Sequence, residues 1–396
     1  MKVLAEVGEV DLFTVTTDTR PEDQLAAPAD VALGRHMILR TAGAPGGLAR
    51  LMAWSRDDRP RELARAGREW AGAEAELRNW AHPPYDLIWY EHTLALHAVG
   101  NTLAALAPDA AIVVDLDNLN DRLMRYRRRV PPLGSSATGL VGTLPRWAAS
   151  RVLDLVDERR WRRWQHEVAS AATIVTVCSD LDRRWLGVLN CRVVPNCYEP
   201  AGPVERVRSF DVERPVFCFV GLLDYAPNAD AATWLARKVF PLVRARHPGS
   251  ELHLVGRYGP VVEKLAGAEG VKLCGRVADM GEVLRRVDVV VVPLRYGGGT
   301  RLKVLEGFAW KVPVVSTTIG CEGLEVTDGQ QLLIGDTKHD LADACSRIVS
   351  DSGLREGLVG RAYRHYEDRF GGELVRGEIC RVAREAISSR LRGERS

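Results

Sequence analysis

The stretch YGGGTRLKVLEGFAWKVPVVST, residues 296–317, decides the fold of the second half of this chain. It follows a β-branched run, VDVVVVPL, and continues into an apolar pattern of helical period. Three glycines lead into Thr300, Arg301 and Lys303, and the helical pattern carries one acid, Glu306. The order is therefore strand, glycine-rich loop and helix, which is the unit that builds parallel sheets.

Two interpretations of this junction stay open on spacing alone. In the first, glycine amides, a helix N-terminus and the cations Arg301 and Lys303 bind a diphosphate, while Glu306 accepts two hydroxyl hydrogen bonds from a ribose. In the second, the glycines only make a tight turn, and Lys303 pairs with Glu306 on the helix surface. The first interpretation predicts a nucleotide site, and the second predicts only a stable helix.

Composition narrows the function classes. The 396 residues are 46% apolar with a net charge of +2, which is ordinary for a globular chain of two domains and gives no electrostatic case for nucleic acid. The longest apolar run is too short to cross a bilayer, and the opening MKVLAEVGEVDLF lacks the pattern of a signal peptide. The eight cysteines include no CxxC pair, so no zinc or redox site is indicated. We expect a cytoplasmic protein without a metal or other cofactor.

Short apolar runs alternate with longer helical patterns along most of the chain. In the second half the runs are 215–221, 251–256, 271–275, 287–294, 312–317 and 331–335, and in the first half they are 10–16, 85–92, 110–117 and 172–179. Most are near-continuously apolar, as parallel strands covered on both faces are. This rhythm predicts an α/β protein with doubly wound parallel sheets.

The turn-rich segment 196–215 has no apolar period and is interpreted as a linker. We therefore predict two Rossmann-like domains, residues 1–198 and residues 199–372, that face each other across a cleft at their strand C-termini. A C-terminal helix over 373–396 is expected to follow, and it is a candidate to cross back to the first domain.

The ordered motifs FVGLLDYAPNADAATWL, LHLVG, LCGRVADMGEVLRRVDVVVVPL and GGGTRLKVLEGFAWKVPVVSTTIGCEGLEV resemble the donor domain of family 4-like glycosyltransferases. These are retaining enzymes of the two-Rossmann architecture called GT-B. The resemblance runs through most of residues 172–370 and continues more weakly through DLIWYEH and VVDLDNLNDRL. It implies transfer of a sugar from a nucleotide diphosphate sugar, the co-substrate, to an acceptor hydroxyl on a glycan, a lipid-linked sugar or a small natural product. Retention in this family is attributed to front-face attack, so no protein nucleophile is implied.

The resemblance also implies roles for individual residues. Glu306 matches the carboxylate that holds the donor ribose, and Arg301 and Lys303 are the candidates for neutralising the diphosphate. His92 ends the run DLIWYEH, where the family often places a polar residue near the donor sugar, and a plain surface histidine is the alternative. The other implied donor-binding residues are Gly221, Asn228, Arg276, Val277, Gly298, Gly299 and Thr300.

The chain departs from the family pattern at two places. Many relatives carry a second glutamate eight residues before the ribose-binding one, where this chain has Gly298, and this leaves the donor sugar open. Many also have an arginine and a lysine after the first donor-domain strand, where this chain reads GLLDYAPNAD. That gap moves phosphate binding onto Arg301 and Lys303, with Asn228 assisting. A catalytically silent sugar-nucleotide-binding relative and a nucleotide-sugar epimerase of the same architecture are the alternative functions.

Two further features have a functional and a structural interpretation. DLDN, Asp115–Asn118, resembles a metal-binding DxD, but its surroundings match the GT-B acceptor half, and a loop acid capping a helix from Asn118 is the preferred interpretation. DERRWRRWQHEV puts Trp161 and Trp164 on one stripe opposite an arginine face. This helix either packs into the core, which we favour, or rests on the inner membrane face, near a lipid-linked acceptor.

The resemblance carries one prediction about the beginning of the chain. Relatives open with a buried strand, a glycine-rich loop and a helix that precede the strand reading like VDLFTVT. Here Met1 falls inside that helix, so the first strand and glycine loop of the acceptor domain are predicted to be missing. An upstream start codon, or a weakly active and aggregation-prone product, would follow.

Overall fold

The computed structural model describes residues 3–16, 33–40, 54, 58–64, 70, 72–130, 140–200, 202, 204–205, 209–299 and 301–393, with the backbone alone for 140–149 and 393. The chain forms two compact units. Unit 1 comprises residues 1–124, 153–194 and 375–396, and unit 2 comprises residues 125–152 and 195–374. Among the described residues, no helix combines the length and the apolar character that a membrane span requires.

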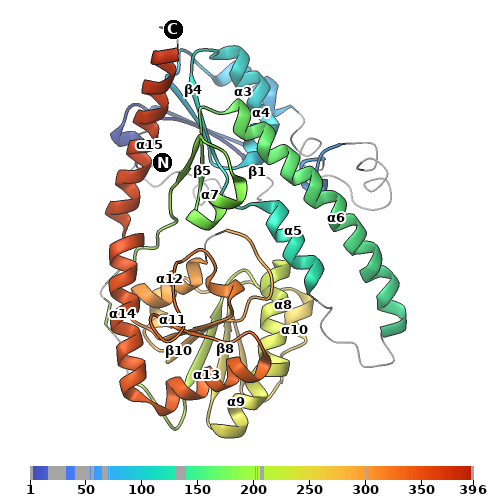
Figure 1. Ribbon diagram of the computed structural model, residues 1–396, viewed down its shortest axis with the longest axis vertical. Helices are drawn as coiled ribbons and strands as arrows, with labels where there is room; N and C mark the ends of the chain where they lie inside the picture. The colour runs from blue at the N-terminus through green and yellow to red at the C-terminus, as the bar shows by residue number, and fades with distance from the viewer. Residues whose placement is uncertain are drawn as a thin grey trace. The chain divides into compact units, whose positions relative to one another are not determined.

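Unit 1 is built on a four-stranded parallel sheet in the order β3–β4–β5–β6. Its strands are β3 (Leu87–Tyr90), β4 (Ala111–Asp115), β5 (Ile174–Val177) and β6 (Cys191–Val193). Its helices include α3 (Ala73–Trp80), α4 (Thr93–Leu106), α7 (Asp180–Leu186) and parts of α5 (Asn120–Arg129), α6 (Leu140–Ala171) and α15 (Gly372–Gly393). Helix α15 covers one face of β4 and β5 through Val382 and Ala386, which are both buried (Figure 1). The strands are mostly apolar, as strands of a sheet covered on both faces are.

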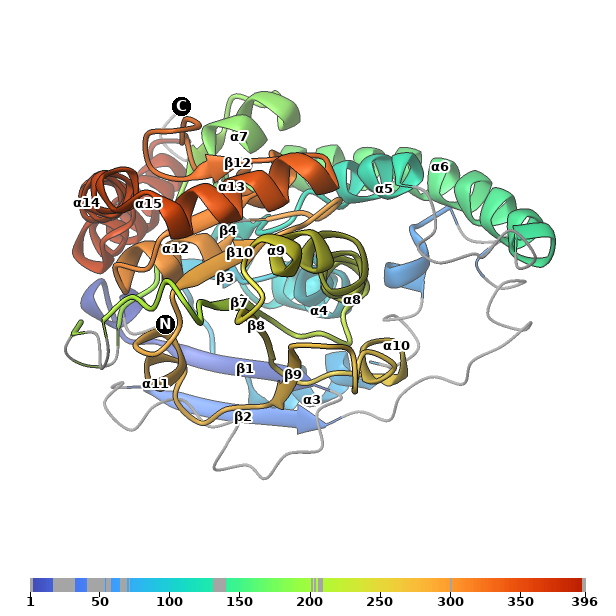
Figure 2. The same ribbon diagram turned by 90° about the horizontal axis from the view of Figure 1, so that it is seen from below.

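Two more strands of unit 1 form a separate ribbon. β1 (Asp11–Thr16) and β2 (Arg35–Arg40) lie side by side and run parallel in continuous register (Figure 2). β1 coincides with the strand expected at 10–16, whereas β2 was not predicted. The sequence of β2, RHMILR, has a polar residue at each end and only three apolar residues, so it gives little strand signal. The prediction about a missing opening strand stays a prediction.

Unit 2 is built on a six-stranded parallel sheet in the order β12–β11–β10–β7–β8–β9. Its strands are β7 (Val216–Val220), β8 (Glu251–Val255), β9 (Val271–Gly275), β10 (Val289–Val292), β11 (Val314–Ser316) and β12 (Leu333–Ile334). Its helices include α8 (Ala226–Trp234), a π-helical segment (Leu235–Val239), α9 (Phe240–Arg246), α10 (Pro260–Glu263), α11 (Met280–Leu284), α12 (Leu302–Ala309), α13 (Lys338–Ser350) and α14 (Ser352–Phe370). Together they enclose one large apolar core.

Helix α12 lies close against this sheet because a glycine faces it. A Cβ atom on Gly307 would come within 2.6 Å of Val314 Cγ2 on β11, so only a bare backbone fits there. Val304, Leu305 and Phe308 on the same helix are buried in the core. This packing sets the direction of the helix whose N-terminus meets the glycine loop.

The favoured interpretation of the tryptophan stripe on α6, packing into the core, is confirmed for Trp161. The alternative interpretation placed this residue at a membrane, but its side chain is only 1% exposed. Trp164 is partly buried, and its ring meets that of His97 edge to face at 5.6 Å. The tryptophan stripe therefore packs inside unit 1, because burying large aromatic rings gains more than leaving them on a surface.

Candidate functional site

The strand order of unit 2 locates a ligand-binding edge. From β7 the chain proceeds to β8 and β9 on one side, and from β10 it proceeds to β11 and β12 on the other. The order therefore reverses between β7 and β10. In open parallel sheets ligands bind beyond the strand C-termini at such a reversal. The two loops at this point are 221–225, before α8, and 293–301, before α12.

The second of these loops is wrapped around the side chain of Arg301. This guanidinium is only 5% exposed, and it donates to the carbonyls of Gly298 (2.5 Å) and Gly299 (3.0 Å) through Nη1 and to that of Ile319 (2.8 Å) through Nε. Gly299 has a left-handed backbone, φ +69°, which favours glycine. Thr300, which the resemblance placed in the donor site, lies outside the described residues.

Lys303 and Glu306 lie three residues apart on the first turns of α12, and both side chains are partly exposed. Burial lowers the pKa of Lys303 to about 8, and Arg301 adds to this while the Glu306 carboxylate opposes it. Burial raises the pKa of Glu306 to about 7, partly offset by Lys303. No hydrogen bond or ion pair joins these two described side chains. Each therefore keeps its polar atoms available for a ligand.

The side chain of Lys303 on α12 lies next to the first loop, 221–225. A Cβ atom on Gly221, just after β7, would lie 3.2 Å from Lys303 Cε and 3.0 Å from Asn228 Nδ2. Asn228 is buried and donates from Nδ2 to the Leu222 carbonyl at 2.9 Å, which holds the loop in place. Gly221 itself has φ +153°. The structure thus brings three of the predicted residues, Gly221, Asn228 and Lys303, together at the reversal point.

The ends of β7 and β8 approach so closely that both need bare backbone. A Cβ atom on Gly256, which has φ +128°, would lie 1.8 Å from the Gly221 carbonyl oxygen. The amide of Gly256 in turn donates to the Gly275 carbonyl at 2.7 Å, at the end of β9. Arg276 and Val277 follow directly, Arg276 exposed and Val277 packed against the core. These two predicted base-framing residues therefore lie at the same edge of the sheet, beyond β9.

His92 belongs to unit 1. It is exposed and occupies the N-cap position of α4 without a side-chain capping bond. Its role near a donor sugar stays a prediction. His97, five residues on, donates from Nε2 to the Leu63 carbonyl at 3.1 Å and accepts at Nδ1 from Arg59 Nη1 at 3.1 Å, so its ring is engaged in the fold of unit 1.

The acidic segment DLDN ends β4. Burial raises the pKa of Asp115 to about 7; the Thr176 hydroxyl, which donates to it at 2.9 Å, opposes this, and Asp117 and Glu91 add to it. Asp117 accepts from Cys178 Sγ at 3.1 Å, and α5 begins at Asn120 rather than at Asn118, so the expected capping role is wrong. Within the described ranges, no group of three or more side chains is arranged to hold a metal ion.

Sequence reasoning missed one polar contact of this site. Tyr126 on α5 donates from its hydroxyl to Glu322 Oε1 at 2.7 Å, and Glu322 Oε2 lies 3.8 Å from Arg301 Nη2. Tyr126 and Glu322 are 196 residues apart in the sequence. A contact between residues so far apart cannot be predicted from a local motif. The only local signal at Glu322 is that this acid and a glycine follow the η4 turn (Ile319–Cys321).

Comparison with known proteins places this edge in a family context. Residues 214–351, which contain both loops at the reversal point together with Lys303 and Glu306, match the family model described as "Glycosyl transferases group 1". An uncharacterized 44.6 kDa protein in the cps region of Klebsiella pneumoniae is 29% identical over 180 residues, which is 43% of this chain and 46% of that protein. A D-inositol 3-phosphate glycosyltransferase of Actinosynnema mirum is 39% identical over 88 residues, 22% of this chain and 21% of that protein. The chain thus matches less than half the length of these curated relatives.

Solved structures match over nearly the whole chain. Sucrose-phosphate synthase from Thermosynechococcus elongatus superposes with a TM-score of 0.66 at 18% identity, covering 98% of this chain and 92% of that one. Anabaena HepE in complex with UDP and glucose superposes with a TM-score of 0.61 at 15% identity, covering 94% and 99%. The fold is GT-B. At these identities the likeness concerns the fold alone, and it agrees with the parallel sheets of both units of this GT-B chain.

Proposed function

We propose that this GT-B protein is a retaining glycosyltransferase of the family 4 type, which moves a hexose from a nucleotide diphosphate sugar to an acceptor hydroxyl. The observation that carries the proposal is the position and partial burial of the Lys303 and Glu306 side chains. One potential cation and one potential anion lie on α12 at the reversal point of a parallel sheet, and neither has an ion-pair partner among the described residues. This point lies inside the segment that matches the group 1 glycosyl transferase model.

Each group suits one part of a sugar nucleotide. The Glu306 carboxylate accepts hydrogen bonds from the two ribose hydroxyls, since an ionised carboxylate is the strongest acceptor for paired O–H donors. Lys303, beside Gly221 and Asn228, is the point charge for the diphosphate. The loop amides near Gly298 and Gly299 add uncharged donors at a helix N-terminus. Arg276 and Val277 frame the base beyond β9.

In the proposed transfer step, the protein stabilises the leaving group and supplies no nucleophile. As the bond between the anomeric carbon and the diphosphate oxygen breaks, negative charge grows on the leaving group, where Lys303 and the loop amides stabilise it. The acceptor oxygen forms the new bond on the same face, and its proton passes to the departing phosphate. His92 is the residue of unit 1 proposed to contact the donor sugar. The acceptor is a glycan, a lipid-linked sugar or a small natural product, and the reaction is placed in the cytoplasm.

Turnover on a donor panel tests the proposal. The protein is incubated with UDP-, GDP-, ADP- and dTDP-linked hexoses, and released nucleoside diphosphate is measured with candidate acceptors and with water alone. We expect release from one nucleotide class, and ¹H NMR of the product should show the anomeric configuration of the donor. The negative control is Lys303→Met, which should release much less nucleoside diphosphate than the parent protein. A protein that neither binds nor consumes any of these donors would overturn the proposal, and an inverted product would overturn retention.

A further inference from the structure

We propose that Arg301 is a positioning residue that shapes the glycine loop, and that Glu322 and Tyr126 hold it in place. In this account the guanidinium does not contact the diphosphate, and Lys303 is the direct cation. The inference rests on the proposed function, because the loop is taken to bind a nucleotide diphosphate. It assigns the two cations of the TRLK motif to different tasks.

The hydrogen bonds of Arg301 point into the protein. Its Nη1 atom donates to the Gly298 and Gly299 carbonyls, its Nε atom donates to the Ile319 carbonyl, and its Nη2 atom faces Glu322. A guanidinium has five N–H donors in a rigid plane, and these contacts use all three of its nitrogens. With 5% of the side chain exposed, little of the guanidinium remains for a phosphate.

Two of the three glycines of the motif, Gly297 and Gly299, fit the same arrangement. A Cβ atom on Gly297 would lie 3.1 Å from Arg301 Nη1 and 3.3 Å from Cζ, tighter than ordinary contacts. Gly299 adopts a left-handed backbone next to the carbonyl that receives Nη1. The loop therefore encloses the guanidinium at van der Waals distance. Because the peptide group is planar and trans, a Gly298 carbonyl that faces Arg301 leaves the N–H of Gly299 on the opposite side of that peptide group.

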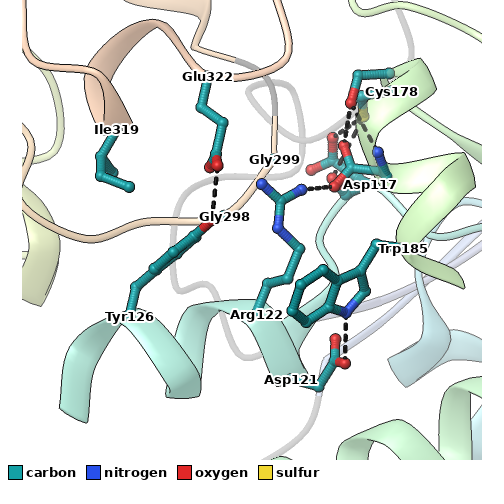
Figure 3. Close-up of polar contacts among 12 residues, drawn as sticks. Asp117, Asp121, Arg122, Tyr126, Cys178, Trp185, Gly298, Gly299, Ile319 and Glu322 are labelled. Atoms are coloured by element: carbon teal, nitrogen blue, oxygen red, sulfur yellow. Dashed lines mark hydrogen bonds and ion pairs between the residues drawn. The ribbon is translucent and has the colours of Figure 1, made fainter. Parts of the chain in front are cut away.

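Glu322 supplies the countercharge that a buried guanidinium requires. The carboxylate oxygen Oε2 lies 3.8 Å from Nη2, and the side chain of Glu322 is only 16% exposed. Its other oxygen accepts the Tyr126 hydroxyl at 2.7 Å (Figure 3). Both oxygens thus have partners, and a buried charge without one would cost several kilocalories per mole. Tyr126, Glu322 and Arg301 all belong to unit 2, so they form a continuous chain of contacts from α5 to the glycine loop.

The chief rival assigns Arg301 to the diphosphate directly, as a second cation beside Lys303. The two accounts differ for the Arg301→Lys variant. A lysine keeps the positive charge but cannot donate to three separate carbonyls in the guanidinium plane. If Arg301 meets the phosphate, lysine should retain most of the affinity. If Arg301 shapes the loop, lysine should lose about as much as Arg301→Gln.

The test measures binding of UDP, GDP, ADP and dTDP, and of the matching nucleosides, to the full-length protein and four variants. For the diphosphate that the parent binds, we expect Kd to rise about tenfold in Arg301→Lys, Arg301→Gln and Glu322→Gln, and about threefold in Tyr126→Phe. Nucleoside affinity should not change. Glu325→Gln is the matched control, because Glu325 lies on the same segment but pairs at 2.7 Å with Arg369 at the surface.

Melting temperature separates loop geometry from folding. A merely structural role would lower it in step with both nucleoside and diphosphate affinity, whereas positioning changes diphosphate affinity alone. Should an Arg301 variant fail to fold, Glu322→Gln and Tyr126→Phe still decide the matter. Full diphosphate affinity in Arg301→Lys, or in both Glu322→Gln and Tyr126→Phe, would overturn this inference. Failure of the parent protein to bind any of the four diphosphates would instead overturn the proposed function.

Discussion

Lys303 and Glu306 lie three residues apart on α12, yet no hydrogen bond or ion pair joins their side chains. A surface pair would favour both charges, whereas burial shifts both groups toward their neutral forms, with pKa values of about 8 and about 7. This relationship bears directly on the two interpretations of the glycine junction. It argues against a helix-surface pair and for two groups held ready for a ligand.

Removing the carboxylate should weaken donor binding. Glu306→Ala deletes the acceptor for two ribose hydroxyls, each bond to a charged group being worth about 1.5–3 kcal/mol. The melting temperature should not fall, because Glu306 has no ion-pair partner to lose among the described residues. Titration calorimetry with a sugar nucleotide measures the effect, and Glu282→Ala, at an exposed position of α11, is the control. Unchanged affinity with a lowered melting temperature would favour the surface-pair interpretation.

Removing the lysine should separate phosphate from nucleoside recognition. In Lys303→Met, affinity for the nucleoside diphosphate should fall about tenfold or more, because a charge-assisted contact is lost. Affinity for the bare nucleoside should stay the same. Competition binding measures both, and Lys264→Met, an exposed lysine before β9, serves as control. A parallel fall of both affinities would show that Lys303 supports the fold rather than the phosphate.

Donor affinity should be greatest in a narrow pH window. Glu306 must be ionised, so affinity should fall below its pKa of about 7, and Lys303 must be protonated, so affinity should fall above its pKa of about 8. Sugar nucleotides are the suitable probe, because their esterified diphosphate does not titrate there. Glu306→Gln should abolish the acidic limb alone and Lys303→Met the alkaline limb alone. A flat profile between pH 6 and 9 would contradict this assignment.

The same shifts predict how stability depends on pH without a ligand. The pKa of Glu306 is raised from 4.5, so its contribution is present below pH 4.5 and is lost as the pH rises through about 7. The pKa of Lys303 is lowered from 10.5, so its contribution is present above pH 10.5 and is lost as the pH falls through about 8. Chemical denaturation of Glu306→Gln across pH 4–8 should therefore show less loss of stability than the parent. An unchanged pH dependence would count against a buried carboxyl.

Gly256→Ala should lower the free energy of unfolding by forcing apart the backbone at the ends of β7 and β8. The new Cβ atom would lie 1.8 Å from the Gly221 carbonyl oxygen, so β7 and β8 must separate at a cost of about 3 kcal/mol. Gly267→Ala isolates the strain of a positive φ, since Gly267 has φ +84° and no atom within 4 Å of its Cβ position, and it should cost about 1 kcal/mol. Urea denaturation compares the two. Equal losses would mean that the loop can move aside.

The second half of the fold was predictable because its strands are apolar on both faces. Each run expected between 215 and 335 contains one of the strands β7 to β12, and the parallel α/β architecture is confirmed. The first half was harder. Strand β2 has polar ends, and β6 has only three residues, so neither gives a periodic signal.

The site was predictable only as far as local spacing reaches. The glycine loop, Lys303 and Glu306 lie within ten residues of one another, and a strand–loop–helix motif joins them. The burial of Arg301 and the Glu322–Tyr126 contact depend on packing between segments far apart in the chain, which no local pattern records. By contrast, the spacing of Trp161 on its helix favoured a core position, and its buried side chain confirms this.

The central claim is that the protein binds a nucleotide diphosphate sugar through Lys303 and Glu306. Titration calorimetry of the parent and of the Lys303→Met/Glu306→Ala double variant, with UDP-, GDP-, ADP- and dTDP-linked hexoses at pH 7.5, tests it most directly. The parent should bind one nucleotide class at a single site. The double variant should bind it at least about a hundredfold more weakly, at a melting temperature no lower than that of the parent. Equal affinity of parent and double variant, or no binding of any of these donors by the parent, would contradict the claim.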